Sequence, residues 1–166
     1  MRRRAAVCCH LTYPKGRLLF SGAYSHSVDS KGRTVIPSKF RSKLGERFYL
    51  ARGMHGCLWV FGEEEWRGFQ TMMTPTSPLD SRGLKLERFF IGSAIECVPD
   101  AQGRIFIPQN LRDYAGIADD VWLVGLGNKV EIWCSARWQE FNNALTDDVI
   151  EQLGLNLLRQ GQEQQG

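Results

Sequence analysis

The chain has 166 residues, 43% of them hydrophobic and 23% charged, which is the composition of a globular protein and excludes a disordered one. No apolar run approaches the ~18 residues that a transmembrane helix needs, and the first ten residues lack the apolar stretch of a signal peptide. We therefore expect a cytoplasmic protein of one compact domain or two small lobes, with no membrane partner.

The cysteines indicate core packing rather than a metal centre. There are five of them, none forms a C-x-x-C pair, and the three histidines are scattered. A structural zinc site needs four clustered ligands, so we expect neither a metal nor a cofactor. We predict that Cys57, Cys97 and Cys134 are small core residues.

Positive charge is concentrated at the start of the chain. Residues 1–50 contain 11 Lys or Arg and two acids, whereas residues 51–166 contain 10 Lys or Arg and 16 acids. Residues 18–50 alone still have a net charge of +4. This asymmetry favours a polyanion partner, which would be bound through phosphate neutralisation and counterion release. The alternative is that Arg2, Arg3 and Arg4 form a solvated basic tail.

One nine-residue phrase occurs twice, as DSKGRTVIP at 29–37 and as DAQGRIFIP at 100–108. The similarity extends in both directions and includes Arg41 and Arg112, which are also 71 positions apart. A fixed internal period indicates duplicated supersecondary units, and two copies suggest a pseudo-twofold arrangement.

The two units predict the same elements in the same order. In the first, alternation over 22–29 indicates a half-buried strand, and a tight turn leads to a short strand over 33–36. A proline then starts a short helix over 38–45, and two further strands follow within 47–61. The second unit repeats the turn, the short strand, the helix over 109–116 and the two strands within 120–134.

Each turn is shaped by the two invariant residues of D-x-x-G. Asp29 and Asp100 can accept hydrogen bonds from backbone groups just ahead of them, and Gly32 and Gly103 can adopt positive φ. We assign these four residues a turn-structuring role, since a carboxylate close to phosphate would be repelled.

Helices are predicted outside the repeated phrases. Residues 63–73 and 80–94 are typical of two helices joined by a turn at TPTSP. Residues 135–160 predict two more helices with a break at Thr146–Asp147, where Thr146 would cap the second helix. Residues 161–166 predict a disordered tail.

From about residue 19 to 158 the chain resembles the MraZ family of bacterial transcriptional regulators. The resemblance rests on FSGAYSHSVDSKGRTVIPSKFR, CLWVF…EEEW, ERFFIGSAIECVPDAQGRIFIPQNLRDYAGI and VWLVG…VEIW…RW. Two D-x-x-G-R-x-x-x-P phrases at the family's spacing make it specific, whereas D-x-x-G-R alone would be weak.

The resemblance implies an α+β fold with a mainly β core. Two SpoVT/AbrB-like repeats would interleave into a swapped-hairpin β-barrel with peripheral helices and a pseudo-twofold relation. The implied division is an N-terminal extension (1–18), repeat 1 (23–70), a helical connector (71–93), repeat 2 (94–137), C-terminal helices (138–160) and a tail (161–166). Residues 1–18 lie outside the family pattern, so they are either a natural basic extension or the result of a start codon set too far upstream.

The resemblance also implies a function. Members of the family bind short, G-rich direct repeats in double-stranded DNA upstream of their own division and cell-wall operon. They assemble into rings described as octamers or dodecamers, and their behaviour suggests a repressor associated with the nucleoid. The arginine of D-x-x-G-R is implicated in DNA binding, which maps onto Arg33 and, in the second copy, Arg104.

The residues themselves extend this list of candidates. Lys31, Lys39 and Arg41 flank the first turn and helix, and arginine can pair with guanine while lysine suits phosphate. The second copy has Gln102 in place of Lys31 and fewer bases in its helix. We therefore predict that the first copy dominates DNA contact. The alternative role of Arg33 is an ion pair with Asp29, and the two roles are compatible.

Two other functions compete with DNA binding. An Asp in each of two related units superficially resembles an aspartic-protease dyad, but a cation four residues on would keep each carboxylate ionised, so we expect no enzyme. The other alternative is an AbrB-superfamily interaction module of the antitoxin type, without a promoter target of its own. The five tryptophans could stack on bases, but their apolar neighbours favour core or subunit packing.

Overall fold

A computed structural model of the chain describes residues 20–75 and 77–163, with side chains up to residue 160. The predicted extension, residues 1–18, lies outside the described residues, and so does the last part of the predicted tail.

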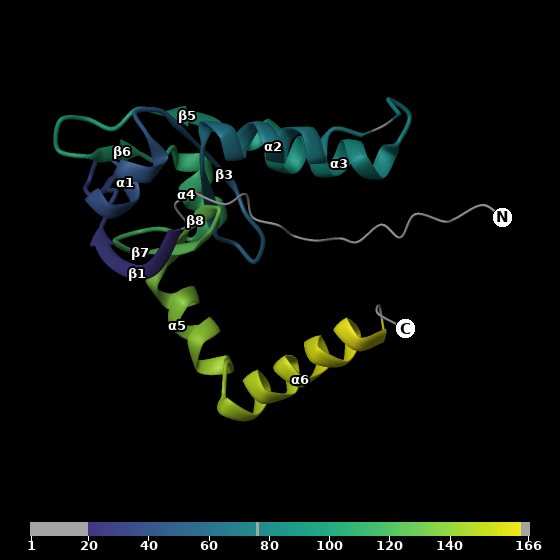
Figure 1. The fold of residues 1–166 in the computed structure, drawn as a ribbon. Coiled ribbons are helices and arrows are strands. Elements are labelled where there is room, and N and C mark those ends of the chain that lie inside the picture. The colour runs from purple at the N-terminus through teal and green to yellow at the C-terminus, as the bar shows by residue number, and fades with distance from the viewer. Residues whose placement is uncertain (1–19, 76, 164–166) are drawn as a thin grey trace.

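The elements follow the duplicated order that the sequence predicts (Figure 1). We group the elements by their equivalence in the two halves, which extends beyond the predicted bounds of 23–70 and 94–137. Repeat 1 then contains β1 (Phe20–Ser27), β2 (Arg33–Val35), α1 (Ser38–Leu44), β3 (Phe48–Arg52), β4 (Leu58–Gly62) and α2 (Glu63–Met73). The connector contains α3 (Ser81–Phe90) and the 3-10 turn η1 (Ile91–Ser93). Repeat 2 contains β5 (Ile95–Cys97), β6 (Arg104–Phe106), α4 (Gln109–Ala115), β7 (Asp120–Gly127), β8 (Lys129–Cys134) and α5 (Ser135–Ala144), and α6 (Asp147–Glu163) follows.

The strands of the two repeats interleave in one antiparallel sheet with the order β1-β7-β8-β4-β3-β5. The first strand of each repeat pairs with the third strand of the other repeat: β1 pairs with β7, and β5 pairs with β3. The registers are equivalent, since His26 is opposite Val121 and Cys97 is opposite Phe48. The α+β class with a mainly β core is confirmed. None of the strand pairings in the described residues closes the sheet, so the barrel stays a prediction.

A separate two-stranded ribbon joins the repeated phrases themselves. In this ribbon β2 and β6 run antiparallel, with Thr34 opposite Ile105 at the centre. The ribbon is continued by two equivalent hydrogen bonds, from Ile36 N to Gly103 O and from Ile107 N to Gly32 O, each 2.9 Å long. The pseudo-twofold axis that relates the two repeats therefore passes between Thr34 and Ile105.

One hydrophobic core connects the ribbon, the short helices and the inner face of the sheet. Its fully buried side chains include Phe40 of α1 and Leu111 of α4, and the ring of Phe40 meets those of Phe20 and Tyr24 edge-on. The prediction that Cys57, Cys97 and Cys134 are core residues is confirmed. Burial raises the pKa of Cys57 and of Cys97 to about 12, so these thiols are unreactive at neutral pH.

Aromatic side chains cover the outer face of the sheet in two equivalent clusters. In cluster 1, Tyr49 and Phe61 of the sheet pack against Trp66 and Phe69 of α2, and in cluster 2, Trp122 and Trp133 of the sheet pack against Trp138 and Phe141 of α5. Trp59 lies between them and donates its Nε1–H to Glu131 Oε1 at 3.0 Å, while Trp133 donates to Glu131 Oε2 at 2.8 Å. The predicted packing role of the tryptophans is confirmed.

The helices of the second half end differently from the prediction. The break after α5 is where the sequence places it, and Thr146 caps α6 through a 3.4 Å hydrogen bond from Val149 N to its hydroxyl. However, α6 continues to Glu163, three residues beyond the predicted end. Within the described residues, no helix combines the length and the apolar character needed to cross a bilayer.

The reciprocal packing of the two turns predicts an unequal response to glycine replacement. Gly103 and Gly116 both have positive φ, but a Cβ on Gly103 would lie 2.5 Å from Cζ of Arg41, whereas a Cβ on Gly116 would meet nothing closer than 3.5 Å. Gly116 is left-handed, with φ of 65° and ψ of 29°, so we expect Gly116→Ala to lower the free energy of unfolding by about 1 kcal/mol through backbone strain alone. We expect Gly103→Ala to lower it by about 2 kcal/mol, because the Arg41 hydrogen bond to Ile36 O is also displaced. Urea unfolding of both variants checks this, and equal losses would contradict it.

Candidate nucleic-acid interface

The first D-x-x-G-R turn is closed by its own aspartate. Asp29 Oδ1 accepts hydrogen bonds from the backbone N–H of Lys31 at 3.0 Å and of Arg33 at 2.9 Å. Its Oδ2 accepts from Arg33 Nε at 2.8 Å and lies 2.7 Å from Arg33 Nη2. Gly32 completes the turn with φ of +76° and donates its N–H to Asp29 O. The side chain of Arg33 is therefore fixed from one side while the rest of its guanidinium faces outward.

The second turn reproduces this geometry almost atom for atom. Asp100 Oδ1 accepts from the N–H groups of Gln102 and Arg104, and its Oδ2 accepts from Arg104 Nε at 2.8 Å. Gly103 has the same φ of +76° as Gly32. The two arginine side chains are exposed to nearly the same extent, 31% for Arg33 and 29% for Arg104.

Both aspartates are held in the ionised form. The Arg33 guanidinium, together with the two backbone N–H groups, lowers the pKa of Asp29 from 3.8 to about 2. The backbone N–H and the guanidinium of Arg104 lower the pKa of Asp100 in the same way. Carboxylates in this state cannot share a proton, which is what an acid dyad would require.

The ribbon places the two arginines on one surface. Side chains alternate between the faces of a strand, and Thr34 and Ile105 point into the core. Arg33 and Arg104 consequently lie on the opposite face, where the register puts Arg33 across from Phe106 and Arg104 across from Val35. The two arginines are diagonal neighbours, at the ~7–8 Å separation of such positions in an antiparallel pair. We call the surface formed by Arg33, Val35, Arg104 and Phe106 the ribbon face.

Arg41 and Arg112 connect each repeat to the turn of the other. Arg41 Nε donates to Ile36 O and Arg112 Nε donates to Ile107 O, each at 3.0 Å. The guanidinium of Arg41 then lies against Gly103, and that of Arg112 lies against Gly32. Arg41 was expected among the DNA contacts, and the structure places it where it also holds the opposite turn in position.

The remaining predicted cations lie beside the first turn. Lys31 and Lys39 are both exposed, at the tip of the turn and at the start of α1. In the second copy the equivalent surface has Gln102 in the turn, and Gln109 bridges Asp113 and Arg112 along α4. The two edges of the ribbon therefore differ in charge although their backbones match.

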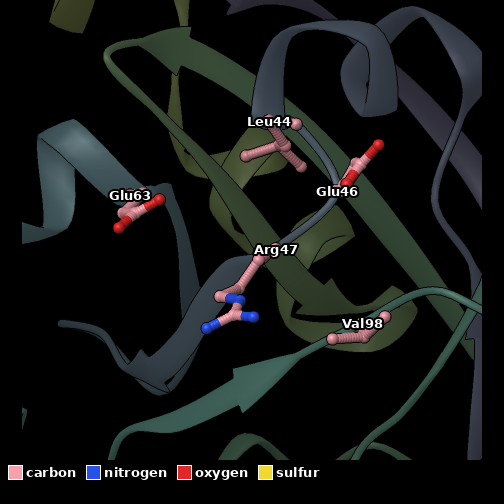
Figure 2. Close-up of a pocket in the computed structure, with 6 residues that line it drawn as sticks. Leu44, Glu46, Arg47, Glu63 and Val98 are labelled. Carbon is pink, nitrogen blue, oxygen red and sulfur yellow. The ribbon is translucent and has the colours of Figure 1, made fainter.

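The hollow shown in Figure 2 has a different character from the ribbon face. It has a volume of about 480 Å³ and lies between the α1–β3 loop, the start of α2 and Val98. Glu46 and Glu63 line it, and Arg47, its cation, pairs with Glu96 at 3.5 Å. The start of α2 adds Glu64 and Glu65 nearby, so this hollow has no surplus of positive charge for a polyanion.

Comparison with known proteins agrees with the duplicated architecture. The profile of the family described as "MraZ protein, putative antitoxin-like" matches residues 19–83 and 90–153. The chain belongs to the MraZ family. A protein of Acetivibrio thermocellus named Transcriptional regulator MraZ is 40% identical over 140 residues, which are 82% of this chain and 98% of that protein.

Other relatives in the MraZ family bear the same name. The protein from Thermoanaerobacter sp. is 42% identical over 84% of this chain and 96% of its own length. The protein from Halothermothrix orenii is 46% identical over 80% of this chain and 93% of its own length. The match of the family profile begins at residue 19, so residues 1–18 lie outside it.

Sequence reasoning missed two features of this surface. Phe106 is 53% exposed on the ribbon face, although the alternating phrase RIFI suggested only a β-strand. Arg112 was noted as the partner of Arg41 in the repeat, but its contact with Gly32 depends on pairing between the repeats. The sequence signal that could have indicated this contact was that Arg41 and Arg112 recur at the same spacing as Gly32 and Gly103.

The ion pair of the first turn predicts a pH dependence. A carboxyl group whose pKa is lowered by folding stabilises the protein above its ordinary pKa of 3.8, and this contribution is lost as the pH falls through about 2. We expect Asp29→Asn to be less stable than wild type at pH 5–7 and the difference to shrink between pH 4 and 2. Thermal unfolding across this range measures it, with the exposed acid Asp148→Asn as control. A difference that does not change with pH would contradict the assignment.

Proposed function

We propose that this protein is a sequence-specific transcriptional regulator that binds double-stranded DNA through the ribbon face. The observation that carries the proposal is the placement of Arg33 and Arg104 on the same solvent-facing side of a two-stranded ribbon. The relatives named Transcriptional regulator MraZ support the same class of function.

A two-stranded antiparallel ribbon has dimensions that suit the major groove of B-DNA, which admits either an α-helix or such a ribbon. Arginine pairs bidentately with O6 and N7 of guanine, so a pair of pre-oriented guanidinium groups favours G-containing sites. In Arg33, Asp29 accepts from Nε and Nη2 on one side. The opposite side of the guanidinium would then pair with a base. Lys31 and Lys39 would contact phosphates on either side.

The finer elements of the function follow the family resemblance. We propose binding to short, G-rich tandem repeats upstream of the protein's own division and cell-wall operon, as a ring homo-oligomer in the nucleoid, with repression as the outcome. A modest set of cations gains avidity when it is repeated around a ring that faces repeated sites. We further propose that the open sheet and the ribbon together form an interleaved, swapped-hairpin barrel.

The competing function is an antitoxin-like interaction module, which the description of the matching family also names. The two hypotheses differ in their ligand. A DNA regulator binds its promoter repeats with a strong salt dependence, whereas an interaction module binds a protein partner and shifts no promoter fragment.

The central prediction concerns the DNA upstream of the protein's own gene. We expect wild type to shift this fragment in a gel, Arg33→Ala to bind at least tenfold more weakly, and Arg104→Ala to show a smaller loss. Losing one guanine contact removes ~1–3 kcal/mol of discrimination. Arg159→Ala, an exposed arginine on α6, is the control. The absence of a shift by wild type would defeat the proposal, and a larger loss in Arg104→Ala would overturn the dominance of the first repeat.

Exchange of one residue between the turns separates phosphate contact from base readout. We expect Lys31→Gln to weaken binding to all sequences alike and to lower the slope of log affinity against log salt by about 0.9, the value for one phosphate. Gln102→Lys, which places lysine in the second turn, should leave that slope unchanged if only the first edge lies against the backbone. Titrations at several salt concentrations measure both variants. An unchanged slope in Lys31→Gln would remove Lys31 from the interface.

A further inference from the structure

Cluster 1 is covered by a second helix, and cluster 2 is not. On repeat 1, the connector helix α3 doubles back along α2 (Figure 1), and Phe90 stacks on Trp59 at 5.3 Å and meets Phe69 edge-on at 5.6 Å. Trp66 is 3% exposed, whereas its equivalent in repeat 2, Trp138, is only partly buried. In repeat 2 the equivalent of Phe69 is Phe141, which is 42% exposed. Within the described residues, α5 has no fully buried side chain.

The helix that follows α5 has the side chains to provide this cover but is not seated on it. α6 begins two residues after α5 and runs at a sharp angle to it rather than back along it (Figure 1). Except for Leu155, its exposed apolar residues recur at the spacing that places them on one side of a helix. They are 36–70% exposed and comprise Val149, Ile150, Leu153, Leu157 and Leu158. We call this set the α6 stripe.

We propose that the α6 stripe of one copy packs on the Phe141–Trp138 side of α5 in a second copy, where it takes the place that α3 has on repeat 1. The internal repeat identifies the chemistry of the missing cover: a helix that presents apolar side chains to a half-buried aromatic cluster. A hollow of about 310 Å³ beside Phe141, lined also by Trp133, Arg137 and Ala144, adds to the unfilled surface of this acceptor.

The size of the contact suits a specific interface. The exposed fractions of the α6 stripe add up to nearly three fully exposed aliphatic residues. Seating them on an equal area of the acceptor would bury on the order of 1,000 Å² in total, which is close to the lower range of specific protein interfaces. α6 has 17 residues, so it reaches about 25 Å from its start, far enough to lie on a neighbouring molecule.

This contact is heterologous, because the donor and the acceptor are different surfaces. Each copy offers one α6 stripe and one uncovered cluster 2, so each copy can give one contact and receive another. Such head-to-tail contacts close into rings when the rotation between copies permits it. The inference thus supplies the subunit contact for the ring in the proposed function, but it does not depend on DNA binding.

A complementation experiment tests the inference. Leu157→Asp removes the donor, since a charge would have to enter the apolar contact, and Phe141→Asp removes the acceptor. We expect wild type to be an oligomer by light scattering, and each variant alone to be a monomer of 18.9 kDa. An equimolar mixture of the two variants should give a species of twice that mass, because the intact α6 of one variant fits the intact cluster 2 of the other. Gln152→Asp, on the opposite side of α6, is the matched control and should keep the wild-type mass.

The other outcomes each overturn the inference. A monomeric wild type would mean that α6 folds back on its own chain. Loss of the oligomer in Leu157→Asp but not in Phe141→Asp would mean that α6 pairs with α6. A mixture that stays monomeric, or variants that keep the wild-type mass, would mean that other surfaces hold the copies together.

If circular dichroism shows that Phe141→Asp is unfolded, Glu140→Arg at the exposed rim of the hollow replaces it. Arg33→Ala, which lies outside this contact, should keep the oligomer while losing the promoter fragment, so that failure of the assembly and failure of DNA binding are told apart.

Discussion

The structure depends on a reciprocal constraint between the two repeated turns. Gly32 and Gly103 share a φ of +76°, and each turn is bounded by an arginine that belongs to the opposite repeat. The same two glycines accept the hydrogen bonds that continue the β2–β6 ribbon. Each turn closes through its own aspartate, but its place in the ribbon depends on contacts with the other repeat, so we expect the two halves to fold as one unit. The ribbon face exists only because of this dependence, since Arg33 and Arg104 come from different repeats.

Arg33 and Arg104 of the ribbon face have two roles: an ion pair with the aspartate of their own turn and, in the proposed function, a contact with DNA. An arginine free in solution would have to be ordered when it binds, at a cost in side-chain entropy. The aspartate of each turn reduces that entropy loss, because its hydrogen bond to Nε already orders the arginine in the folded protein. Its negative charge, however, would weaken the electrostatic attraction of DNA. Asp29 and Asp100 also accept hydrogen bonds from backbone N–H groups of their own turns, so each carboxylate is directed toward its own turn. In the proposed function, orientation and attraction are thus provided by different residues, with Lys31 and Lys39 carrying the attraction.

Local pattern in the sequence was sufficient for the elements but not for their partners. Alternation, the D-x-x-G turns and the prolines before α1 and α4 located the strands and short helices, and the repeat implied a pseudo-twofold relation. Which strand of one repeat pairs with which strand of the other depends on contacts 45 or more residues apart, and a single sequence gives no direct measure of them. The ion pair of Arg33 with Asp29 was foreseen because it is local, at i and i+4. The contact of Arg41 with Gly103 and the exposure of Phe106 were not, because both follow from the pairing of β2 with β6.

Two repeats in one chain can have different residues at equivalent positions, whereas two identical chains in a symmetric dimer cannot. On a true twofold axis a residue must face its own copy, but here the pseudo-axis has Thr34 opposite Ile105 in the ribbon and Trp59 opposite Glu131 in the sheet. The Trp59–Glu131 pair can form a side-chain hydrogen bond because its two residues differ. The indole N–H of Trp59 is donated to the carboxylate of Glu131, and two facing tryptophans or two facing glutamates could not form this bond. The same freedom leaves lysine in one turn and glutamine in the other, and a helix on cluster 1 but not on cluster 2. Duplication preserves the backbone of the two halves, while the differences between them give the molecule one edge of higher positive charge and one uncovered aromatic face.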